Sequence, residues 1–194
     1  MNIENFRSEI NKNGVLKTNK FLVKINPPNS LKGRDTRPIE LRCDNIQWPG
    51  VSFATLDTPP RAGYGATEVI PYAPIFEDIT MTFIVDKNSE THRFFYNWMN
   101  TVINMKSIGQ SLLQKGAYEV GYKDAYSTDI NINVYDDQGV EDKNKVMMAT
   151  LYRAFPRTMP SFDLSWANND EIMKLNVQFT YTDYFITYPK SQLT

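Results

Sequence analysis

The stretch PSFDLSWANNDEIMKLNVQFTYTDYF, residues 160–185, carries the strongest fold signal in this sequence. Polar and apolar residues alternate on both sides of Asn168-Asn169-Asp170, a pattern typical of two β-strands joined by a turn. On the second predicted strand the apolar set is Leu175, Val177, Phe179 and Tyr181, and the polar set is Asn176, Gln178, Thr180 and Thr182. We expect the apolar set to pack in a core, whereas the polar face needs a separate explanation.

Further alternating segments predict that the rest of the chain is also mainly β. Alternation indicates strands in residues 21–25, 39–43, 79–85 and 130–135. Residues 146–155 are apolar on both faces and predict a buried partner strand after a hairpin-type turn at 136–139. Together the strands predict an antiparallel β-sandwich or a partly closed barrel with long extended loops.

One amphipathic helix is expected to flank these strands. Phe94, Trp98 and neighbouring apolar residues recur at helical spacing within 89–104. Asn88 or Ser89 can cap its first turn. We expect Phe94 and Trp98 to be core residues rather than part of a cofactor site.

The sequence predicts a single domain over residues 1–194, with three segments outside the regular strands. Residues 1–18 are polar, with a short amphipathic helix that ends near Gly14. Residues 51–78 combine prolines and glycines with aromatic and β-branched residues, and we expect an extended arm or loose hairpin that reaches a partner. Residues 105–128 show no clear period and predict an irregular insertion.

Composition is globular and argues against tight nucleic-acid binding. Hydrophobic residues make up 41% and charged residues 22% of the chain, and the formal net charge is -1. No segment has the dense Lys/Arg clustering of a surface that grips phosphates. No apolar run is long enough to span a membrane and the first residues lack the pattern of a signal peptide, so we expect no membrane anchor.

Side chains suited to catalysis or metal binding are scarce. The only cysteine is Cys43 and the only histidine is His92, which are too few for a zinc site and lie on different predicted elements. Acidic residues gather at 136–142, but their spacing does not match a calcium-binding loop. We expect no enzymatic activity, no cofactor and no metal, and we favour a structural or binding role.

Several blocks of the sequence together resemble the tail tube proteins of T4-like contractile-tailed bacteriophages. The blocks are 19–25, 41–43 leading into Trp48-Pro49-Gly50, 76–86 with the Phe94 and Trp98 helix after it, and 155–184 with its Leu164-x-Trp166 pattern. Their order and rough spacing extend over nearly the whole chain. Residues 27–38 and 105–128 are longer than in that family, which leaves open a main tube subunit or a related baseplate protein.

The resemblance implies rings of six subunits that stack into a hollow tube inside a contractile sheath, through which DNA passes into the host. It implies a β-sandwich subunit without enzymatic activity, located in the virion tail and assembled in the host cytoplasm. The implied partners are other copies of the chain, the tail sheath protein, the baseplate or tube initiator, the tape measure protein and the tail terminator.

Under this resemblance the polar face becomes a candidate lumen surface, with Asn176, Gln178, Thr180 and Thr182 facing the channel. A conduit for DNA should be polar and neutral to acidic, and Lys174 is the only basic residue between Phe162 and Thr187. The 51–78 segment becomes a candidate inter-ring arm, with the candidate residues Pro59, Pro60, Tyr64 and Tyr72.

Two other functions remain open at this point. A tube initiator or terminator, or the tube of a phage-derived injection system, would share the fold and differ in copy number. A β-sandwich module that binds carbohydrate through Trp48, Trp166 or the tyrosines is a less favoured alternative.

Overall fold

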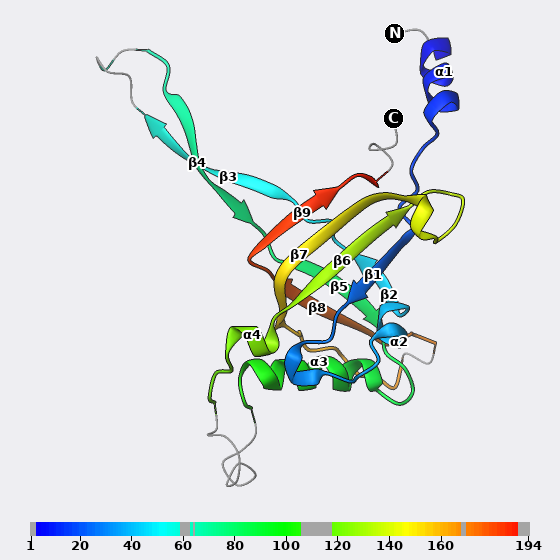
Figure 1. The fold of residues 1–194 in the computed structure, drawn as a ribbon, viewed down its shortest axis with the longest axis vertical. Helices are drawn as coiled ribbons and strands as arrows, with labels where there is room; N and C mark the ends of the chain where they lie inside the picture. The colour runs from blue at the N-terminus through cyan, green and yellow to red at the C-terminus, as the bar shows by residue number, and fades with distance from the viewer. Residues whose placement is uncertain (1–2, 59–62, 64, 106–117, 168–169, 190–194) are drawn as a thin grey trace.

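The computed structural model describes residues 3–58, 63, 65–105, 118–167 and 170–189 (Figure 1). The strands are β1 (Phe21–Ile25), β2 (Cys43–Ile46), β3 (Val51–Thr58), β4 (Glu68–Phe76), β5 (Ile79–Ile84), β6 (Thr128–Tyr135), β7 (Lys145–Thr158), β8 (Lys174–Thr180) and β9 (Asp183–Thr187). The helices are α1 (Ile3–Asn13), α2 (Arg37–Glu40), α3 (Glu90–Val102) and α4 (Lys123–Tyr126), with short 3₁₀ turns at Asn29–Leu31 and Asp142–Asn144. Strand pairs throughout the described residues are antiparallel, which confirms the predicted mainly β class.

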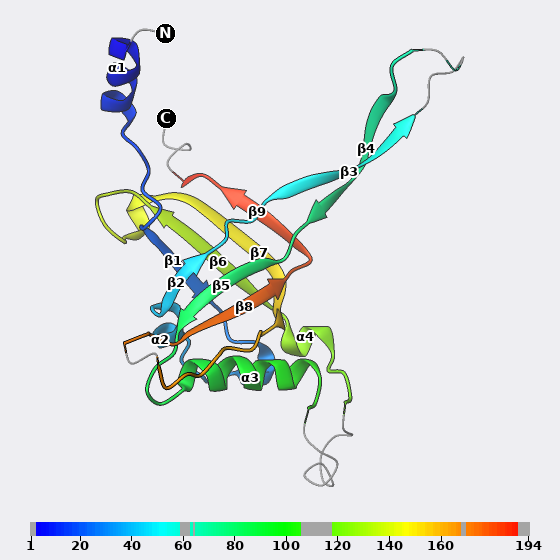
Figure 2. The ribbon, with the colours of Figure 1, turned by 180° about the vertical axis from the view of Figure 1, so that it is seen from behind.

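Two sheets face each other and share the long strand β7 (Figures 1 and 2). The front sheet of Figure 1 has the order β1-β6-β7-β9, and the back sheet has the order β2-β5-β8-β7. β7 pairs with β6 as far as Ala154 and with β8 from Phe155 onward. This change of partner follows Arg153, whose φ of 53° bends the strand. β7 therefore closes one side of the sandwich, while β1 and β2 do not pair with each other on the opposite side.

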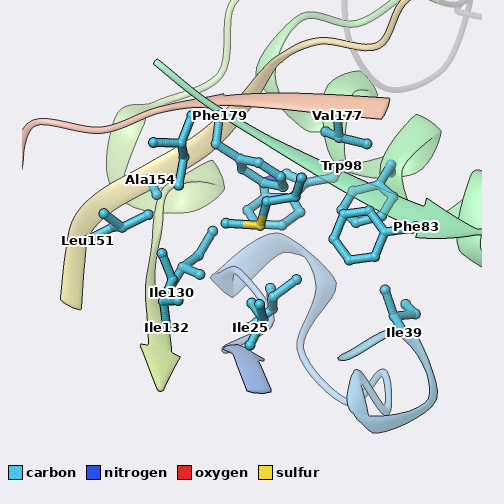
Figure 3. Close-up of a cluster of buried hydrophobic side chains, with 14 of the residues drawn as sticks. Ile25, Ile39, Phe83, Trp98, Ile130, Ile132, Leu151, Ala154, Val177 and Phe179 are labelled. Carbon is cyan, nitrogen blue, oxygen red and sulfur yellow. The ribbon is translucent and has the colours of Figure 1, made fainter. Parts of the chain in front are cut away.

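The inward faces of both sheets and helix α3 form one core (Figure 3). In the back sheet the inward pairs are Ile79 with Phe179, Met81 with Val177, and Phe83 with Leu175. Trp98 of α3 lies 5.9 Å from Phe179 between ring centroids, and Phe95 lies 4.7 Å from Phe83. Burial of side chains of this size stabilises the fold by roughly 1.5–3 kcal/mol each. Among the candidate core residues Leu175, Val177, Phe179, Phe94 and Trp98 are buried, and Tyr181 is partly buried beside them.

Helix α3 confirms the predicted helix at 89–104, but its cap differs from the expectation. Ser89 occupies the N-cap position with a left-handed backbone, and its side chain makes no capping bond. Asp86 takes that role, because its Oδ1 accepts a hydrogen bond from the backbone N–H of Thr91 at 3.2 Å. At the other end, the indole N–H of Trp98 donates to the carbonyl of Tyr126 at 2.7 Å and so holds α4 against α3.

Two elements project from the same end of the sandwich (Figures 1 and 2). β3 and β4 pair only with each other and extend away from the two sheets as a hairpin. Helix α1 stands off the front sheet and is joined to β1 by residues 14–20. Gly14 follows α1 with a φ of 71° and donates to the carbonyl of Ile10 at 2.8 Å, which ends the helix where the sequence predicts.

The strand predicted at 39–43 is wrong. Its first half is helix α2, which has Pro38 in its first turn, and strand β2 begins only at Cys43. The Oε1 atom of Glu40 accepts hydrogen bonds from the Ile25 N–H at 2.8 Å and the Thr36 hydroxyl at 3.2 Å. This contact with the end of β1 favours a helical turn over the extended backbone that alternation suggested.

The hairpin predicted at 160–185 is right in its second half only. The described residues between β7 and β8 form an irregular loop, in which Leu164 and Trp166 are exposed. Strand β8 ends at Thr180, where the sequence predicted a strand through Thr182. The chain then turns into β9, a strand that the sequence did not predict and that pairs with β7.

The connection between β6 and β7 is longer than the predicted hairpin turn. Gly139 donates to the carbonyl of Asp136 at 3.4 Å, so a turn is present at the expected place. The 3₁₀ turn at Asp142–Asn144 follows it before β7 begins at Lys145, and β7 continues to Thr158, beyond the predicted end.

Candidate assembly surfaces

The outward face of the back sheet is a polar surface made by more than one strand. Asn176 and Gln178 of β8 lie opposite Thr82 and Thr80 of β5, so the side chains of these pairs share one face. Asn45 of β2 lies opposite Thr82 and extends the same face. Asn176 is exposed, while Gln178 and Thr180 are partly exposed. Alternation in β5 already indicated that Thr80 and Thr82 share a face, but only the pairing with β8 shows that they belong to this surface.

Hydrogen bonds hold this polar surface in place. The Thr82 hydroxyl donates to Oδ1 of Asn176 at 2.8 Å across the two strands. The side-chain oxygen of Gln47 accepts from the Thr80 N–H at 3.0 Å, which extends the ladder beyond the end of β2.

The basic side chains at the margins of this surface are paired with carboxylates. Lys174 lies 2.6 Å from Asp44 at one end, and Arg157 lies 2.5 Å from Asp78 at the other. Both pairs are partly exposed, so their contribution to stability is small, about 0–1 kcal/mol each. Each pair also neutralises a positive charge at the margin of the surface, and an unpaired positive charge there would attract anions such as phosphate.

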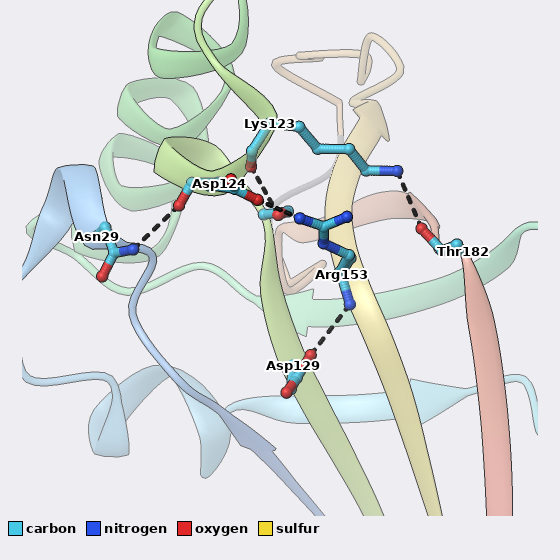
Figure 4. A network of polar contacts seen from close by, with 7 residues as sticks. Asn29, Lys123, Asp124, Asp129, Arg153 and Thr182 are labelled. Atoms are coloured by element: carbon cyan, nitrogen blue, oxygen red, sulfur yellow. Dashed lines mark hydrogen bonds and ion pairs between the residues drawn. The ribbon is translucent and has the colours of Figure 1, made fainter.

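Thr182 lies apart from the other three candidate lumen residues. It follows β8 in the turn that leads to β9, and its N–H donates to the carbonyl of Tyr152 at 3.0 Å. The Lys123 ammonium donates to its hydroxyl at 2.9 Å (Figure 4). A lysine cation therefore lies beside Thr182, whereas the described side-chain partner of Asn176 is a hydroxyl.

The corner around Thr182 also contains the bend of β7 (Figure 4). The carboxylate of Asp129 accepts from the Arg153 N–H at 3.0 Å, and the Arg153 guanidinium pairs with Asp124. The side chain of Asn29 donates to the carbonyl of Asp124 at 3.0 Å. These contacts join β6, β7, α4 and the loop after β1, and they stabilise the bend by which β7 passes from one sheet to the other.

The β3–β4 hairpin is the projecting arm. Its register pairs Val51 with Phe76 at the base and Thr58 with Glu68 at the far end, with a shift between Ala54 and Thr55. The shift leaves Tyr72 without an opposite residue, and this side chain is 71% exposed. Of the candidate arm residues Pro59, Pro60, Tyr64 and Tyr72, the first three lie outside the described residues.

Both faces of this arm carry exposed apolar side chains. The register places Val51, Phe53 and Val69 on one face and Leu56, Ile70 and Ile75 on the other. Each of the six is 45% exposed or more. A strand ribbon in water normally alternates apolar and polar faces, whereas a ribbon that is apolar on both faces is typical of buried strands. An isolated two-stranded hairpin is also only marginally stable in water.

Aromatic rings anchor the base of the arm to the body. Phe76 packs edge-on against Tyr184 at 5.4 Å and lies 6.3 Å from Tyr181 between ring centroids. Burial raises the pKa of the Tyr181 hydroxyl to about 12, with a further contribution from the neighbouring acidic groups. This hydroxyl is buried and makes no hydrogen bond to the described residues.

The two residues considered for chemistry, Cys43 and His92, lie on different elements, β2 and α3. Burial raises the pKa of the Cys43 thiol to about 12, which keeps it in the unreactive protonated form. His92 lies on α3 and stacks on Tyr96 at 6.3 Å. The described residues contain no group of three or more His, Cys, Asp or Glu side chains arranged to hold a metal ion. None of the described helices combines the length and the apolar character needed to cross a membrane.

Comparisons with known proteins give a family from the sequence and a shared fold from solved structures. The sequence matches the family described as "Phage tail tube protein" over residues 16–187. No curated protein sequence matches the chain.

Among the solved structures that share the fold, three illustrate it. A chain from the cryo-EM structure of the anti-feeding prophage baseplate aligns with a TM-score of 0.65 and 11% identity, covering 91% of this chain and 97% of that chain. A chain of the PVC sheath–tube complex in the extended state, from an extracellular contractile injection system, has a TM-score of 0.58 and 17% identity, with 93% and 97% covered. A chain of the anti-feeding prophage tube-terminating cap has a TM-score of 0.57 and 18% identity, with 90% and 91% covered.

Proposed function

The chain belongs to the phage tail tube protein family, and from this premise we propose that six copies form a ring and that the rings stack into a conduit for DNA. Its role in the tail tube is structural. The observation that carries the proposal is the β3–β4 arm, which exposes apolar side chains on both faces. Burying such a ribbon requires surfaces on two sides, and neighbouring copies in a ring and in the next ring would provide them.

The polar outer face of the back sheet is proposed to line the channel. DNA must slide along this surface without binding, so hydroxyls and amides with neutralised basic side chains suit the role. Gln178 lies on this surface between Asn176 and Thr180 on β8 and opposite Thr80 on β5. Sheet edges left unpaired in one copy would pair with neighbours, which would suppress random edge association.

Sheath and terminator proteins are proposed as further partners. The structures that share the fold come from a sheath–tube complex, a baseplate and a terminating cap. A chain at a cap or baseplate position would be present in few copies per particle, whereas a main tube subunit would be the most abundant tail component beside the sheath. Counting copies per particle distinguishes the two positions. We further propose that the chain has no enzymatic activity.

Electron microscopy of the purified protein is the direct test of assembly, and rings or tubes with a central channel are expected. Phe53→Glu should prevent assembly, because it places a charge on the apolar arm, whereas Leu164→Glu on the exposed loop should not. A wild-type protein that remains monomeric at high concentration would overturn the proposal.

Labelling with two sizes of reagent tests which face lines the channel. In a Cys43→Ser background, Gln178→Cys in long tubes should react with a small maleimide and resist a large polymer-linked maleimide. Tyr152→Cys, on the outward face of the front sheet, is the matched control and should react with both. The opposite pattern would assign the channel to the front sheet.

A further inference from the structure

Helix α1 carries apolar side chains on one side and does not pack on either of the two described sheets. Ile3 and Ile10 lie seven positions apart on the same side of the helix; Ile3 is 72% exposed and Ile10 is partly exposed. In both views the helix stands clear of the two sheets (Figures 1 and 2). The family match covers residues 16–187, so α1 lies outside the matched residues.

The same chain has a groove with an apolar lining, which suits the apolar face of α1. The groove has a volume of about 910 Å³ and opens between β1 and β2, where the two sheets do not pair with each other. Its apolar lining includes Phe21, Leu41, Ile46, Trp48, Val134 and Met147. Val134 and Met147 lie opposite each other on the inward face of the front sheet, so the groove exposes one edge of the sandwich interior to water. Covering it would extend the core.

The connection between α1 and β1 keeps the helix out of its own groove. Residues 16–19 themselves line the groove, and the backbone directly after them bonds to the front sheet. Lys17 lies 2.8 Å from Asp137, and the carbonyl of Lys20 accepts from the Tyr135 N–H at 2.8 Å. Gly14 and Val15 remain as the link, which spans about 7 Å when extended. Gly14 ends the helix with a positive φ and a hydrogen bond to Ile10, and this geometry directs α1 away from the sheets. For α1 to bind in the groove of its own chain, the backbone at Gly14 and Val15 would have to change conformation.

We propose that α1 of one copy binds in the β1–β2 groove of a second copy. This inference rests on the proposed assembly, which places grooves at fixed positions beside each helix and so raises their effective concentration. An 11-residue helix buries too little area to hold a dimer in dilute solution. The contact therefore acts together with the arm as a second link between subunits.

Cross-linking between two different variants tests the contact. Cys43 is the only cysteine, so Cys43→Ser gives a cysteine-free background. One variant then carries Ile10→Cys on α1 and the other carries Leu41→Cys in the groove. The two are mixed, assembled and treated with a short bis-maleimide. We expect a covalent dimer containing one chain of each variant, at least tenfold more abundant than with Ser8→Cys on the opposite face of α1.

Other outcomes of this experiment separate the inference from the proposed function. Tubes that form without this cross-link would overturn the helix–groove contact and leave the tube assembly standing. A single chain carrying both cysteines that links only within itself would show that α1 closes its own groove, which also overturns the contact. Wild-type protein without rings or tubes would remove both proposals.

A second measurement does not depend on cysteine chemistry. Ile10→Glu should lower the temperature at which assembled rings dissociate, whereas Ser8→Glu should leave it unchanged. Equal dissociation temperatures for the two variants would contradict the contact.

Discussion

At the scale of single residues, Gly121 packs directly against the backbone at the end of α3. Its N–H donates to the carbonyl of Val102 at 2.8 Å, and a Cβ added at this position would lie 2.4 Å from the carbonyl oxygen of Thr101. Because a helix backbone cannot move aside, we expect Gly121→Ala to lower the free energy of unfolding by about 1–3 kcal/mol. Urea unfolding measures this change. Gly50→Ala is the control, since a Cβ there meets nothing within 4 Å. Equal stability of both variants would contradict the close packing.

Replacing the side chain of Asn133 with an apolar one should stabilise the protein. It is 1% exposed, and neither amide atom of its side chain has a hydrogen-bond partner among the described residues. Its cross-strand neighbours are Leu22 and Met148. We expect Asn133→Leu to raise the free energy of unfolding by about 1–3 kcal/mol, because a desolvated amide is replaced by an apolar side chain of similar size.

A neighbouring asparagine supplies the matched control for that change. Asn131 lies two positions away on β6, and its Oδ1 accepts from the Thr150 hydroxyl at 2.8 Å. Asn131→Leu should therefore destabilise the protein in the same urea titration. A loss of stability in both variants would show that Asn133 has a partner in solution.

At the scale of secondary structure, the start of α3 should make the fold sensitive to acid. Burial works to raise the pKa of Asp86, but hydrogen bonds from Thr91 and the backbone and the charge of Arg42 outweigh it and leave the pKa below its usual value. A carboxyl with a lowered folded pKa contributes stability above its unfolded pKa of about 3.9, and this contribution is lost as the pH falls through the folded value.

Asp86→Asn isolates this effect, because the amide keeps an acceptor for the Thr91 N–H and does not titrate. At pH 7 we expect the variant to be less stable than the wild type by about 0.3–1 kcal/mol, because it loses the negative charge that lies at the start of α3 and beside Arg42. The difference should shrink as the pH is lowered below about 4 and the wild-type carboxyl becomes protonated. Thermal unfolding at a series of pH values measures this, and a difference that stays constant with pH would contradict the role of the Asp86 charge.

Secondary structure was predictable from the sequence where alternation coincided with local turn residues. The strands at 21–25 and 79–85 and the helix at 89–104 were found in this way. The prediction at 39–43 failed because Glu40 bonds to the end of β1, a contact that only the folded chain creates. The alternation around Leu164 and Trp166 also misled, since those side chains are exposed in a loop. An alternating pattern shows that one face of a segment could be buried in a sheet. Whether that face is buried depends on the contacts that the rest of the folded chain offers.

At the scale of the whole molecule, the pairing of distant strands could not be derived from the sequence. No local pattern predicts that β7 changes sheets at Arg153, because positive φ is unusual for this residue type and here accompanies a hydrogen bond from the Arg153 N–H to Asp129, a residue of another strand. The polar face was found on β8 alone, and its continuation through Thr80 and Thr82 required the β5–β8 register. The resemblance to tail tube proteins supplied the family, which the match over residues 16–187 confirms.

The exposure of the arm leads to a prediction about the dynamics of the monomer and the assembly. In a monomer the β3–β4 hairpin is held by its own ladder and by Phe76 at its base, so its amides should exchange with solvent quickly. Strands β6 and β8 lie inside their sheets and should be protected in both states. Hydrogen–deuterium exchange on Phe53→Glu monomers and wild-type assemblies compares the two. Protection of the hairpin should increase by at least about tenfold on assembly, because neighbouring copies then cover both of its faces. A hairpin that exchanges equally fast in both states would show that the arm remains in water within the tube, and the apolar residues on its two faces would then need another explanation.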